Sequence, residues 1–471
     1  MPRTKGHEGA GCGRRTPERA VIVRAMTDHE DLRQRVHDDF DRVRDELEGL
    51  VRIPSVSFPG FDPAHVQASA EATAEILEAS GAQGVRLLEL EGAAPAVFAD
   101  VPGPAGAPTV LLYAHHDVQP PGPEEAWLSP PFEPAEREGR LYGRGSCDDK
   151  AGVVVHAAAL RAHGARPPVG VKVFIEGEEE AGSPNLGRFL EAHGNDLAAD
   201  VIVLADTSNW DTGVPGLTTT LRGLVDCVVE VRVADHAVHS GMYGGPVPDA
   251  ITALARLLAT LHDERGNVAV PGLATGERPA ADLTEDEYRA DIGARPGLRL
   301  IGEGSITERL WVKPAVAVLG LDAPRVDEAS NQIVPVARAK VSLRLAPGDD
   351  AHRARDALAK HLETNAPWGA EVTVHPGGAG EPHRVRAEGP VYDAARRAFR
   401  DAWGVDPVDI GAGGSIPFVA DFAARWPEGA LLLTGVEDRR GHAHAENESI
   451  DLLELERACL AEALLLRYLV P

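Results

Sequence analysis

The stretch TVLLYAHHDV (residues 109–118) decides the fold of this chain, because a short apolar run leads directly into two histidines and an aspartate. The apolar part has the length and composition of a buried strand. Similar apolar runs occur at residues 96–100, 170–175 and 200–205, and helical patterns occur at residues 66–80, 149–163 and 185–193. Strands that alternate with helices predict an α/β domain, in which a mostly parallel sheet is sandwiched between helices.

Polar side chains follow these predicted strands at their carboxyl ends. His115, the acidic run 176–180 and Asp206 each come just past an apolar run. Because the functional crevice of a parallel sheet lies beyond the carboxyl ends of its strands, we expect these side chains to lie close together. The same set includes Asp148, which lies at the entrance of the helix 149–163. It also includes His444, which follows a predicted strand at 430–434.

Each motif also has a purely structural explanation when it is taken alone. His115 and Asp117 face the same way on an extended segment, so that one can bind a metal ion while the other orients it. The same pair can also be a loop histidine and a solvated aspartate. Asp148 and Asp149 are equally well explained as a helix N-cap, and the run 176–180 as a solvated acidic loop. Taken alone, Asp206 would be a turn cap and His444 a surface histidine.

The combination of these motifs favours a metal centre. Imidazole and carboxylate ligands without a thiolate suit zinc or similar divalent cations. Five ligands exceed what one catalytic zinc ion takes, so a site for two ions with a shared carboxylate is expected. Adjacent Glu179 and Glu180 would allow one side chain to ligate a metal ion while the other takes a proton from water. A metal-dependent enzyme is therefore the leading hypothesis.

The composition excludes several other classes of protein. The 471 residues are too many for one ordinary core, so two domains are expected. The net charge of −26 argues against a nucleic-acid partner. No apolar run approaches the roughly 18–20 residues that cross a membrane. The four cysteines are widely spaced and lack a CxxC pair, which predicts a reducing, cytoplasmic location rather than a disulfide framework or a zinc ribbon.

Residues 1–26 are expected to form a disordered leader. They are rich in Gly and Arg and lack the apolar segment of a secretory signal. Met26 directly precedes the first helical pattern, residues 27–50, and our hypothesis is that the native protein starts there.

An inserted domain is predicted from about residue 220 onward. Strand patterns at 225–233, 315–319, 337–345 and 371–374 and helical patterns at 248–262 and 350–364 occur in the order β-α-β-β-α-β. This order is that of a ferredoxin-like α+β unit. A Gly/Pro-rich segment at 376–382 predicts a linker. A helical pattern at 389–403 follows it and returns to the strand–helix alternation of the first domain. We therefore expect a catalytic domain in two parts, residues 27–219 and 386–471, with the insert at 220–385. The polar excursion at 266–308 carries no predicted function.

The motifs around the candidate ligands resemble those of a known family. They are AHHDVQP (114–120), GRGSCDDK (143–150), EEAGS (179–183), HSG (239–241) and HAENE (444–448). They are similar to the motifs of the dinuclear zinc metallopeptidases, which include carnosinase-type dipeptidases, glutamate-releasing carboxypeptidases, aminoacylases and succinyl-diaminopimelate desuccinylases. The resemblance extends over about residues 30–470.

The resemblance implies a role for each candidate residue. One metal ion would be bound by His115 and Asp206 and a second by Glu180 and His444, with Asp148 shared between them. Glu179 would be the general base, and Asp117 would orient His115. The Asp148–Asp149 peptide bond is typically cis in the family. The implied cofactors are two divalent ions, zinc in the first place, with manganese or cobalt as alternatives.

The inserted domain would act as a lid and as a dimerisation domain. His239 resembles a histidine that crosses a dimer interface to polarise the scissile carbonyl group, which implies a homodimer. Asn331 and Arg344 match positions that engage the polar end of the substrate. Gly414 and Ser415 belong to a loop whose backbone N–H groups receive the substrate carboxylate.

The expected function is hydrolysis of the amide bond of a dipeptide or short peptide by a water molecule that bridges two metal ions. Closeness of the segments 117–120 and 179–183 to carnosinase-type members favours dipeptides over the alternative, an N-acyl amino acid deacylase or desuccinylase. A more remote alternative is a non-catalytic metal-binding protein on the same scaffold. The expected partner is a small peptide or N-acyl amino acid, with neither nucleic acid nor membrane.

Overall fold

The apolar run of the opening stretch forms strand β3 (Thr109–His115), which is buried from Val110 onward. The computed structural model describes residues 17–414 and 417–470 of the chain. β3 lies in the middle of a nine-stranded sheet. In spatial order this sheet contains β1 (Gln83–Leu88), β2 (Ala96–Val101), β6 (Gly170–Glu176), β3, β7 (Val201–Leu204), β17 (Ala430–Leu433), β8 (Gly216–Leu221) and β15 (His383–Arg384), and β16 (Val408–Ala412) pairs with β8.

The four central strands β6, β3, β7 and β17 run parallel, as the sequence predicts. β1 and β2 continue the sheet antiparallel on one side. The carboxyl ends of the central strands therefore meet at one edge, where the candidate ligands begin. The loops at this edge also form a small sheet of β4 (Ala135–Arg137), β5 (Arg140–Tyr142) and β18 (Ser449–Asp451).

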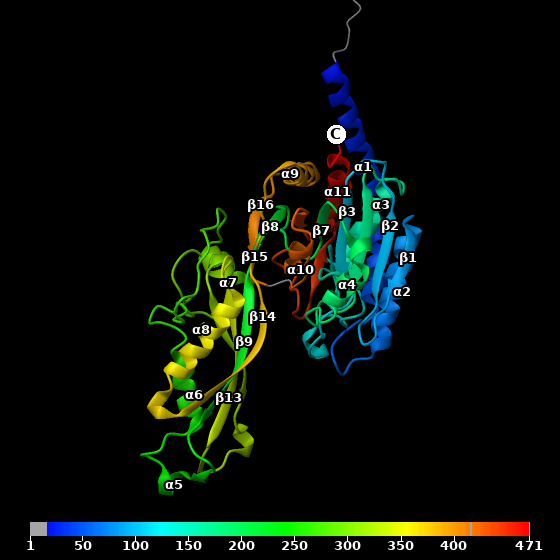
Figure 1. Cartoon of the computed structure of the whole chain (residues 1–471). Helices are drawn as coiled ribbons and strands as arrows, with labels where there is room; N and C mark the ends of the chain where they lie inside the picture. The colour runs from blue at the N-terminus through cyan, green and yellow to red at the C-terminus, as the bar shows by residue number, and fades with distance from the viewer. Residues whose placement is uncertain (1–16, 415–416, 471) are drawn as a thin grey trace, which may run out of the picture.

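Helices cover both faces of the nine-stranded sheet (Figure 1). Phe174 of β6 contacts Phe189 on one side of the sheet. Ala114 of β3 points to the other side, where it lies so close to Gly152 that an added Cβ there would be 3.0 Å away. The helices of this domain are α1 (Pro17–Val51), α2 (Pro63–Ala79), α3 (Lys150–Ala162), α4 (Leu186–Leu197), α9 (Pro390–Trp403), α10 (Pro417–Arg425) and α11 (Leu452–Tyr468). Among the described residues, no helix is both long and apolar enough to cross a membrane.

Helix α1 begins earlier than the sequence pattern predicts. It starts at Pro17, so that residues 17–26 of the expected disordered leader are helical. Residues 18–26 contain neither Gly nor Pro, so no residue interrupts the helix before its amphipathic part. Residues 1–16 lie outside the described part of the chain, and the start at Met26 stays a prediction.

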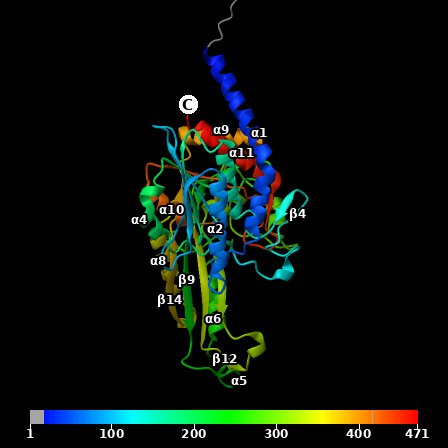
Figure 2. The same ribbon diagram turned by 90° about the vertical axis from the view of Figure 1, so that its right-hand side faces the viewer.

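The inserted domain has the ferredoxin-like topology that the sequence predicts. Its elements are β9 (Gly223–Arg232), α6 (Ala250–Ala259), β11 (Ala315–Asp322), β13 (Val336–Leu345), α8 (Ala351–Thr364) and β14 (Glu371–Gly380). The four strands are antiparallel in the order β11-β13-β9-β14. Alternate residues of β9 are buried, which gives this domain a hydrophobic core of its own. Figures 1 and 2 show the domain extending away from the nine-stranded sheet.

The far end of the inserted domain carries short elements. They are β10 (Val238–His239), β12 (Gln332–Ile333) and α5 (Ser240–Tyr243). The excursion at 266–308 contains α7 (Glu285–Asp291) and leads into a five-residue π-helix, η2 (Glu308–Val312).

The segment that we expected to be a linker, residues 376–382, is mostly strand. β14 continues to Gly380, with Pro376 opposite Cys227 and an irregular register before Ala379. β14 lies at the edge of its sheet, where a proline need not donate a ladder hydrogen bond. Gly377 lies against the carboxylate of Asp226, so a side chain would not fit there.

Strand pairing shifts the expected limits of the insert, residues 220–385, by a few residues. β8 ends at Leu221 and β15 begins at His383, and both belong to the nine-stranded sheet. The crossings between the two domains therefore lie at about 222 and 381–382.

Candidate metal centre

The loops at the carboxyl edge of the sheet bring the five predicted ligands together. The Nε2 atom of His115 lies 3.1 Å from Oδ1 of Asp148 and 3.8 Å from Oδ1 of Asp206. The Nε2 atom of His444 lies 2.9 Å from Oδ2 of Asp148 and 3.2 Å from Oε2 of Glu180. The two oxygens of Asp148 thus face two different histidines, which is the arrangement that a carboxylate shared by two ions requires.

The donor set fits divalent metal ions. His115, Glu179 and Asp206 form one group whose ligand atoms lie within 4.8 Å of one another, and His115, Asp148 and Glu180 form a second such group. All donors are imidazole nitrogens or carboxylate oxygens, which suit zinc, manganese or cobalt. The sequence therefore predicts the cluster correctly as a spatial group.

Asp117 contacts both His115 and the loop that carries the glutamates. Its Oδ1 lies 3.4 Å from Nδ1 of His115, and its backbone oxygen lies 3.1 Å from the same nitrogen. Its carboxylate also accepts hydrogen bonds from the backbone N–H groups of Glu179 and Glu180, each at 3.1 Å, and from Ser57 at 2.6 Å. This buried side chain can therefore position ligands on two loops at once.

The entrance of α3 has an irregular backbone. The Asp148–Asp149 peptide bond is cis, as the resemblance implies. Asp149 accepts hydrogen bonds from the N–H groups of Gly152 and His115, so it caps α3 and joins the helix to the end of β3. Its capping role is the structural explanation that the sequence offered, and it leaves Asp148 free to face the cluster.

Glu448 fixes the turn before Asp148, a role that the sequence reasoning missed. Its carboxylate is fully buried and accepts hydrogen bonds from the N–H groups of Gly145, Cys147 and Asp148. Arg144 donates a further hydrogen bond at 2.6 Å. The signal was present, because Glu448 ends the HAENE motif and the turn belongs to the GRGSCDDK motif.

Burial raises the pKa values of three carboxylates of the cluster, whereas at Asp148 burial is outweighed by hydrogen bonds from His115 and His444, which lower its pKa. Burial raises the pKa of Glu179 well above its usual value, with the charge of Asp206 as the next cause. Burial likewise raises the pKa of Asp206, and it raises the pKa of Glu180 to about 7. Glu179, Glu180 and Asp206 therefore favour protonation until a cation compensates their charge.

The histidines shift in the direction that the neighbouring carboxylates dictate. Hydrogen bonds to Asp148 and Glu180 raise the pKa of His444 to about 11. Burial opposes protonation of His115, but hydrogen bonds to Asp117 and Asp148 outweigh it and raise the pKa of His115 well above its usual value. Metal binding requires neutral histidines and ionised carboxylates, so loading the site should release protons.

Glu437 is a further acidic residue of the cluster that the sequence reasoning missed. Its ligand atom lies within 4.8 Å of those of Asp148 and Asp206. Ser208 donates a hydrogen bond of 2.9 Å to it. Glu437 follows β17 as Asp206 follows β7, so the rule that placed polar residues at strand ends also applied to it.

A cavity of about 510 Å³ opens over the cluster. The acidic residues Asp148, Glu179, Asp206 and Glu437 contribute to its lining. The lining also includes the apolar and aromatic residues Leu283, Tyr288, Leu310, Trp210 and Trp311, and the rings of the two tryptophans meet edge to face with centroids 6.0 Å apart.

The excursion at 266–308 forms part of the wall of this cavity. It contributes Leu283, Tyr288 and Asp291 to the lining. Asp291 also pairs with Arg439 at 2.9 Å, on the loop that leads to His444. The segment for which the sequence suggested no function therefore shapes the space above the candidate metal centre.

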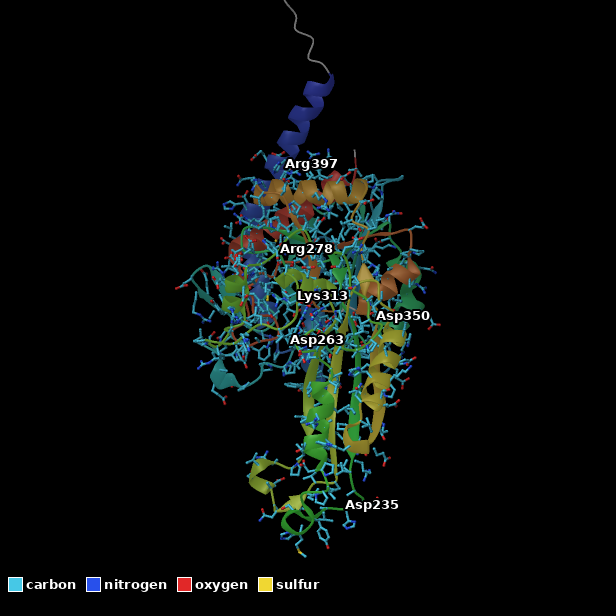
Figure 3. All side chains as sticks on the ribbon, turned by 90° about the vertical axis from the view of Figure 1, so that its left-hand side faces the viewer. Asp235, Asp263, Arg278, Lys313, Asp350 and Arg397 are labelled. Carbon is cyan, nitrogen blue, oxygen red and sulfur yellow. The ribbon has the colours of Figure 1, made fainter. Side chains whose placement is uncertain are left out.

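His239 and Asn331 do not join the cluster. They lie next to each other at the far end of the inserted domain, where the N–H of Ser240 donates to the backbone oxygen of Asn331 at 3.0 Å. Figure 1 shows α5, which begins directly after His239, at the opposite end of the molecule from α9. Asp235, four residues before His239, is labelled at that end in Figure 3. The His239 side chain is exposed.

The remaining predicted substrate residues lie nearer the cavity. Gly414 lines it. Arg344 lies on β13 opposite Leu224, close to the crossing between the domains. Ser415 lies outside the described residues. Of the two neighbouring histidines His442 and His444, it is His444 whose Nε2 contacts Asp148 and Glu180, as the sequence predicts.

Known proteins resemble this chain along most of its length. The model of peptidase family M20/M25/M40 matches residues 111–468. A cysteinylglycine-S-conjugate dipeptidase of Corynebacterium striatum is 34% identical over 432 residues, which are 90% of this chain and 94% of the relative. A Beta-Ala-His dipeptidase of Rattus norvegicus is 30% identical over 76% of both chains.

Solved structures show the same fold. Human carnosine dipeptidase 1 superimposes with a TM-score of 0.79 and 26% identity over 94% of this chain and 98% of its own. The dipeptidase Dug1p of Saccharomyces cerevisiae also has a TM-score of 0.79, at 23% identity and the same coverage.

Proposed function

Because the chain belongs to peptidase family M20/M25/M40, we propose that it is a metal-dependent dipeptidase that hydrolyses dipeptides with a free amino terminus. The observation that carries the proposal is Asp148, whose two oxygens face histidines on opposite sides. Relatives that cover most of the chain are named for dipeptides, one of them a cysteinylglycine conjugate and another β-Ala-His.

The proposed metal sites follow the contacts in the cluster. His115 and Asp206 would hold one ion, Glu180 and His444 the other, and Asp148 both. Zinc is the proposed metal, with manganese and cobalt as the alternatives. When bound, the two ions supply Lewis-acid chemistry, which lowers the pKa of water and polarises the scissile carbonyl group.

Glu179 is the proposed general base. It lines the cavity and takes no part in the histidine contacts of Asp148 and Glu180. Its backbone N–H is held by Asp117, which fixes the start of its side chain relative to His115. From this place Glu179 can take a proton from the attacking water and pass it to the leaving amine.

Glu437 supports a substrate with a free amino group. It lines the cavity as a carboxylate beyond the five proposed ligands and the proposed base. An ammonium group of the substrate would compensate its charge, whereas an N-acyl group would leave a carboxylate facing a neutral substrate in a partly dry site. A dipeptide therefore fits this cavity better than an N-acyl amino acid does.

The two tryptophans suggest the kind of side chain that the substrate carries. Trp210 and Trp311 add aromatic, apolar surface to the lining of the cavity. A cavity of this size whose lining combines apolar and charged side chains suits a dipeptide with at least one bulky apolar side chain.

The position of His239 supports a homodimer. β11 forms one edge of the sheet of the inserted domain and exposes Val318, Leu319 and Leu321, which are 43%, 62% and 63% accessible. An exposed apolar edge strand is a pairing surface for another chain. Association through this edge would let His239 and Asn331 of one protomer serve the cavity of its partner.

The cysteines are compatible with the proposed cytoplasmic location. Cys147, Cys227 and Cys459 are buried and free. Free, buried thiols are the ordinary state of cysteine in a reducing compartment.

A matched substrate panel tests the proposal. Each dipeptide is assayed beside its N-acetylated form, with protein loaded in turn with zinc, manganese or cobalt. Hydrolysis confined to the free dipeptides is the expected result, and preference for the N-acetylated forms would replace the proposal by the deacylase alternative.

The variant Glu437→Gln sharpens this panel. It should lower kcat/KM for free dipeptides by about 10–100-fold, because a hydrogen bond to a charged group is lost. Glu363→Gln, an exposed charge on α8, is the control and should have no effect. Metal content is measured in parallel, and loss of metal in Glu437→Gln would show that Glu437 is a ligand instead.

A further inference from the structure

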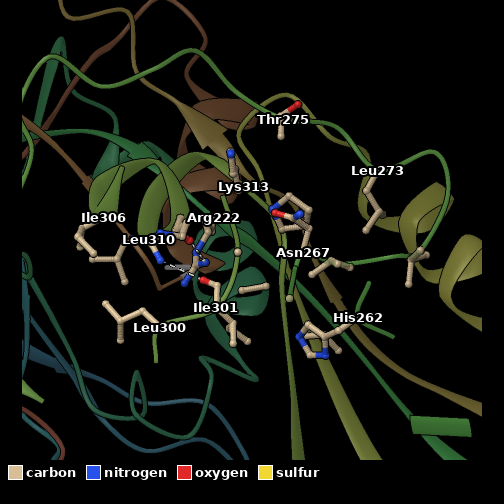
Figure 4. Close-up of a pocket in the computed structure, with 18 of the residues that line it drawn as sticks. Arg222, His262, Asn267, Leu273, Thr275, Leu300, Ile301, Ile306, Leu310 and Lys313 are labelled. Carbon is tan, nitrogen blue, oxygen red and sulfur yellow. Dashed lines mark hydrogen bonds between the residues drawn. The ribbon is translucent and has the colours of Figure 1, made fainter. Parts of the chain in front are cut away.

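A second cavity, of about 560 Å³, lies in the inserted domain between the excursion at 266–308 and the start of β11 (Figure 4). None of the proposed metal ligands lines it. It shares Tyr288 and Leu310 with the cavity above the metal cluster, so these two side chains separate the two spaces.

The lining of this cavity has an unusual charge. Arg222, Arg309 and Lys313 contribute to it together with His262, and no carboxylate side chain does. Acidic residues outnumber basic ones by 73 to 47 in the whole chain. A cavity lined only by basic charges in an acidic protein therefore attracts anions selectively.

Arg222 is the group that most needs a counter-ion. It is only 8% exposed. Its Nε donates to the backbone oxygen of Gly413 at 3.2 Å and its Nη1 to that of Arg309 at 3.5 Å, and both acceptors are neutral. Burial and the neighbouring Arg344 lower the pKa of Arg222 to about 10.

Arg309 adds a second cation without an acidic partner. Its Nε and Nη1 donate to the backbone oxygens of Ser305 and Ile301. Within residues 17–414 and 417–470, no carboxylate lies within ion-pair distance of Arg222 or Arg309. Buried charge is costly unless it is paired, so the buried Arg222 favours a ligand that supplies negative charge, and the half-buried Arg309 adds to this preference.

Most of the other lining side chains are apolar, with Asn267, Thr275 and Tyr288 as the polar exceptions. Figure 4 shows Leu300, Ile301, Ile306 and Leu310 around Arg222. The volume is within the range of pockets that hold small organic molecules. We propose that this cavity binds an amphipathic organic anion, whose oxyanion group lies on Arg222 and Arg309 and whose apolar part lies against Leu300, Ile301 and Ile306.

The site is connected to the substrate cavity by one hydrogen bond. Arg222 holds the backbone oxygen of Gly413, which lines the cavity above the metal cluster together with Gly414. An anion on Arg222 would compete for the same guanidinium group. Occupancy should therefore change the rate of hydrolysis without excluding the substrate.

Titration calorimetry on the metal-loaded full chain tests the proposal. The probes are octanoate, inorganic phosphate and uncharged octanamide. Saturable binding of octanoate with weak or absent binding of the other two is expected. If phosphate binds as tightly as octanoate, or if none of the probes binds, the amphipathic site is disproved. Because the titration needs no turnover, its outcome is independent of the proposed dipeptidase activity.

Variants locate the site. Arg309→Gln should weaken octanoate binding at least about tenfold, because one charge-assisted hydrogen bond is lost. Arg222→Lys keeps the charge that bridges the domains but removes the planar fork, and it should also weaken binding. Arg295→Gln, exposed in the same excursion and outside the lining, is the control and should bind normally. Normal binding in both cavity variants, or competition between octanoate and a dipeptide substrate, would overturn the proposal.

Discussion

The two domains of this chain hold their functional residues in opposite ways. The nine-stranded-sheet domain gathers its proposed ligands from separate strand and helix ends into one cluster, as the contacts of Asp148 with His115 and His444 show. The inserted domain instead carries His239, exposed, at the end farthest from that cluster (Figure 1). Metal ligands must share one rigid frame to within a fraction of an ångström. A group that only polarises a carbonyl needs a stiff support, and a second chain can provide it.

The largest effect is expected from Asp148→Asn, which tests whether the first domain is complete by itself. The variant removes a charge that both proposed metal sites share, so metal affinity should fall by more than the roughly 10–100-fold that is typical when a residue merely orients a ligand. Bound metal is measured by elemental mass spectrometry. Glu179→Gln is the matched control and should retain metal while kcat falls by about 10²–10⁴-fold. Full metal content in Asp148→Asn would contradict the shared-carboxylate arrangement.

The second prediction tests whether the inserted domain works on a partner chain. His239→Ala alone should lower kcat by about 10²–10³-fold, as loss of one oxyanion donor does. When the His239→Ala and Glu179→Gln chains are co-expressed, a mixed dimer combines an intact Glu179 with the intact His239 of its partner. Random pairing should then restore about a quarter of the wild-type activity. No recovery in proven mixed dimers would show that His239 does not act across an interface.

The sequence predicted the spatial grouping of the cluster because the ends of neighbouring parallel strands lie at the same edge of the sheet. His115 and Asp206 follow buried strands that pair directly, β3 with β7, so their proximity follows from strand order. Glu437 obeys the same rule after β17, which pairs with β7. Glu437 was not predicted because the interpretation of this segment rested on the motif at His444, seven residues further on.

Other features depended on contacts that no local pattern carries. The wall formed by the excursion at 266–308 rests on Asp291 and Arg439, which are far apart in the sequence. The course of β14 through Pro376 depends on its place at a sheet edge, and that place is a property of the assembled domain. The location of His239 likewise follows from the direction in which the inserted domain extends. The sequence showed that these three segments exist, but it did not show which residues they contact.

The smallest predicted effect concerns His116, which is the neighbour of the proposed ligand His115. The prediction tests whether the buried end of the strand tolerates a positive charge. Burial lowers the pKa of His116 to about 4, and its Nε2 lies 2.9 Å from the backbone oxygen of Pro95 while its Nδ1 is buried without a partner. The folded chain therefore keeps His116 neutral while the unfolded chain binds a proton below about pH 6.5. Stability should be lost as the pH falls from about 6.5 to about 4, by roughly 3 kcal/mol in all.

Urea unfolding of metal-free protein between pH 7 and pH 4 measures this loss. His116→Gln keeps a donor for Pro95 but cannot take up a proton, so its stability should depend less on pH than that of the wild type over this window. His352→Gln, an exposed change on α8 of the inserted domain, should leave the dependence unaltered. Because the metal ligands are the same in all three proteins, their own titration cancels in the comparison. Equal slopes for His116→Gln and wild type would mean that acid sensitivity resides in the ligand cluster rather than in the strand end that supports it.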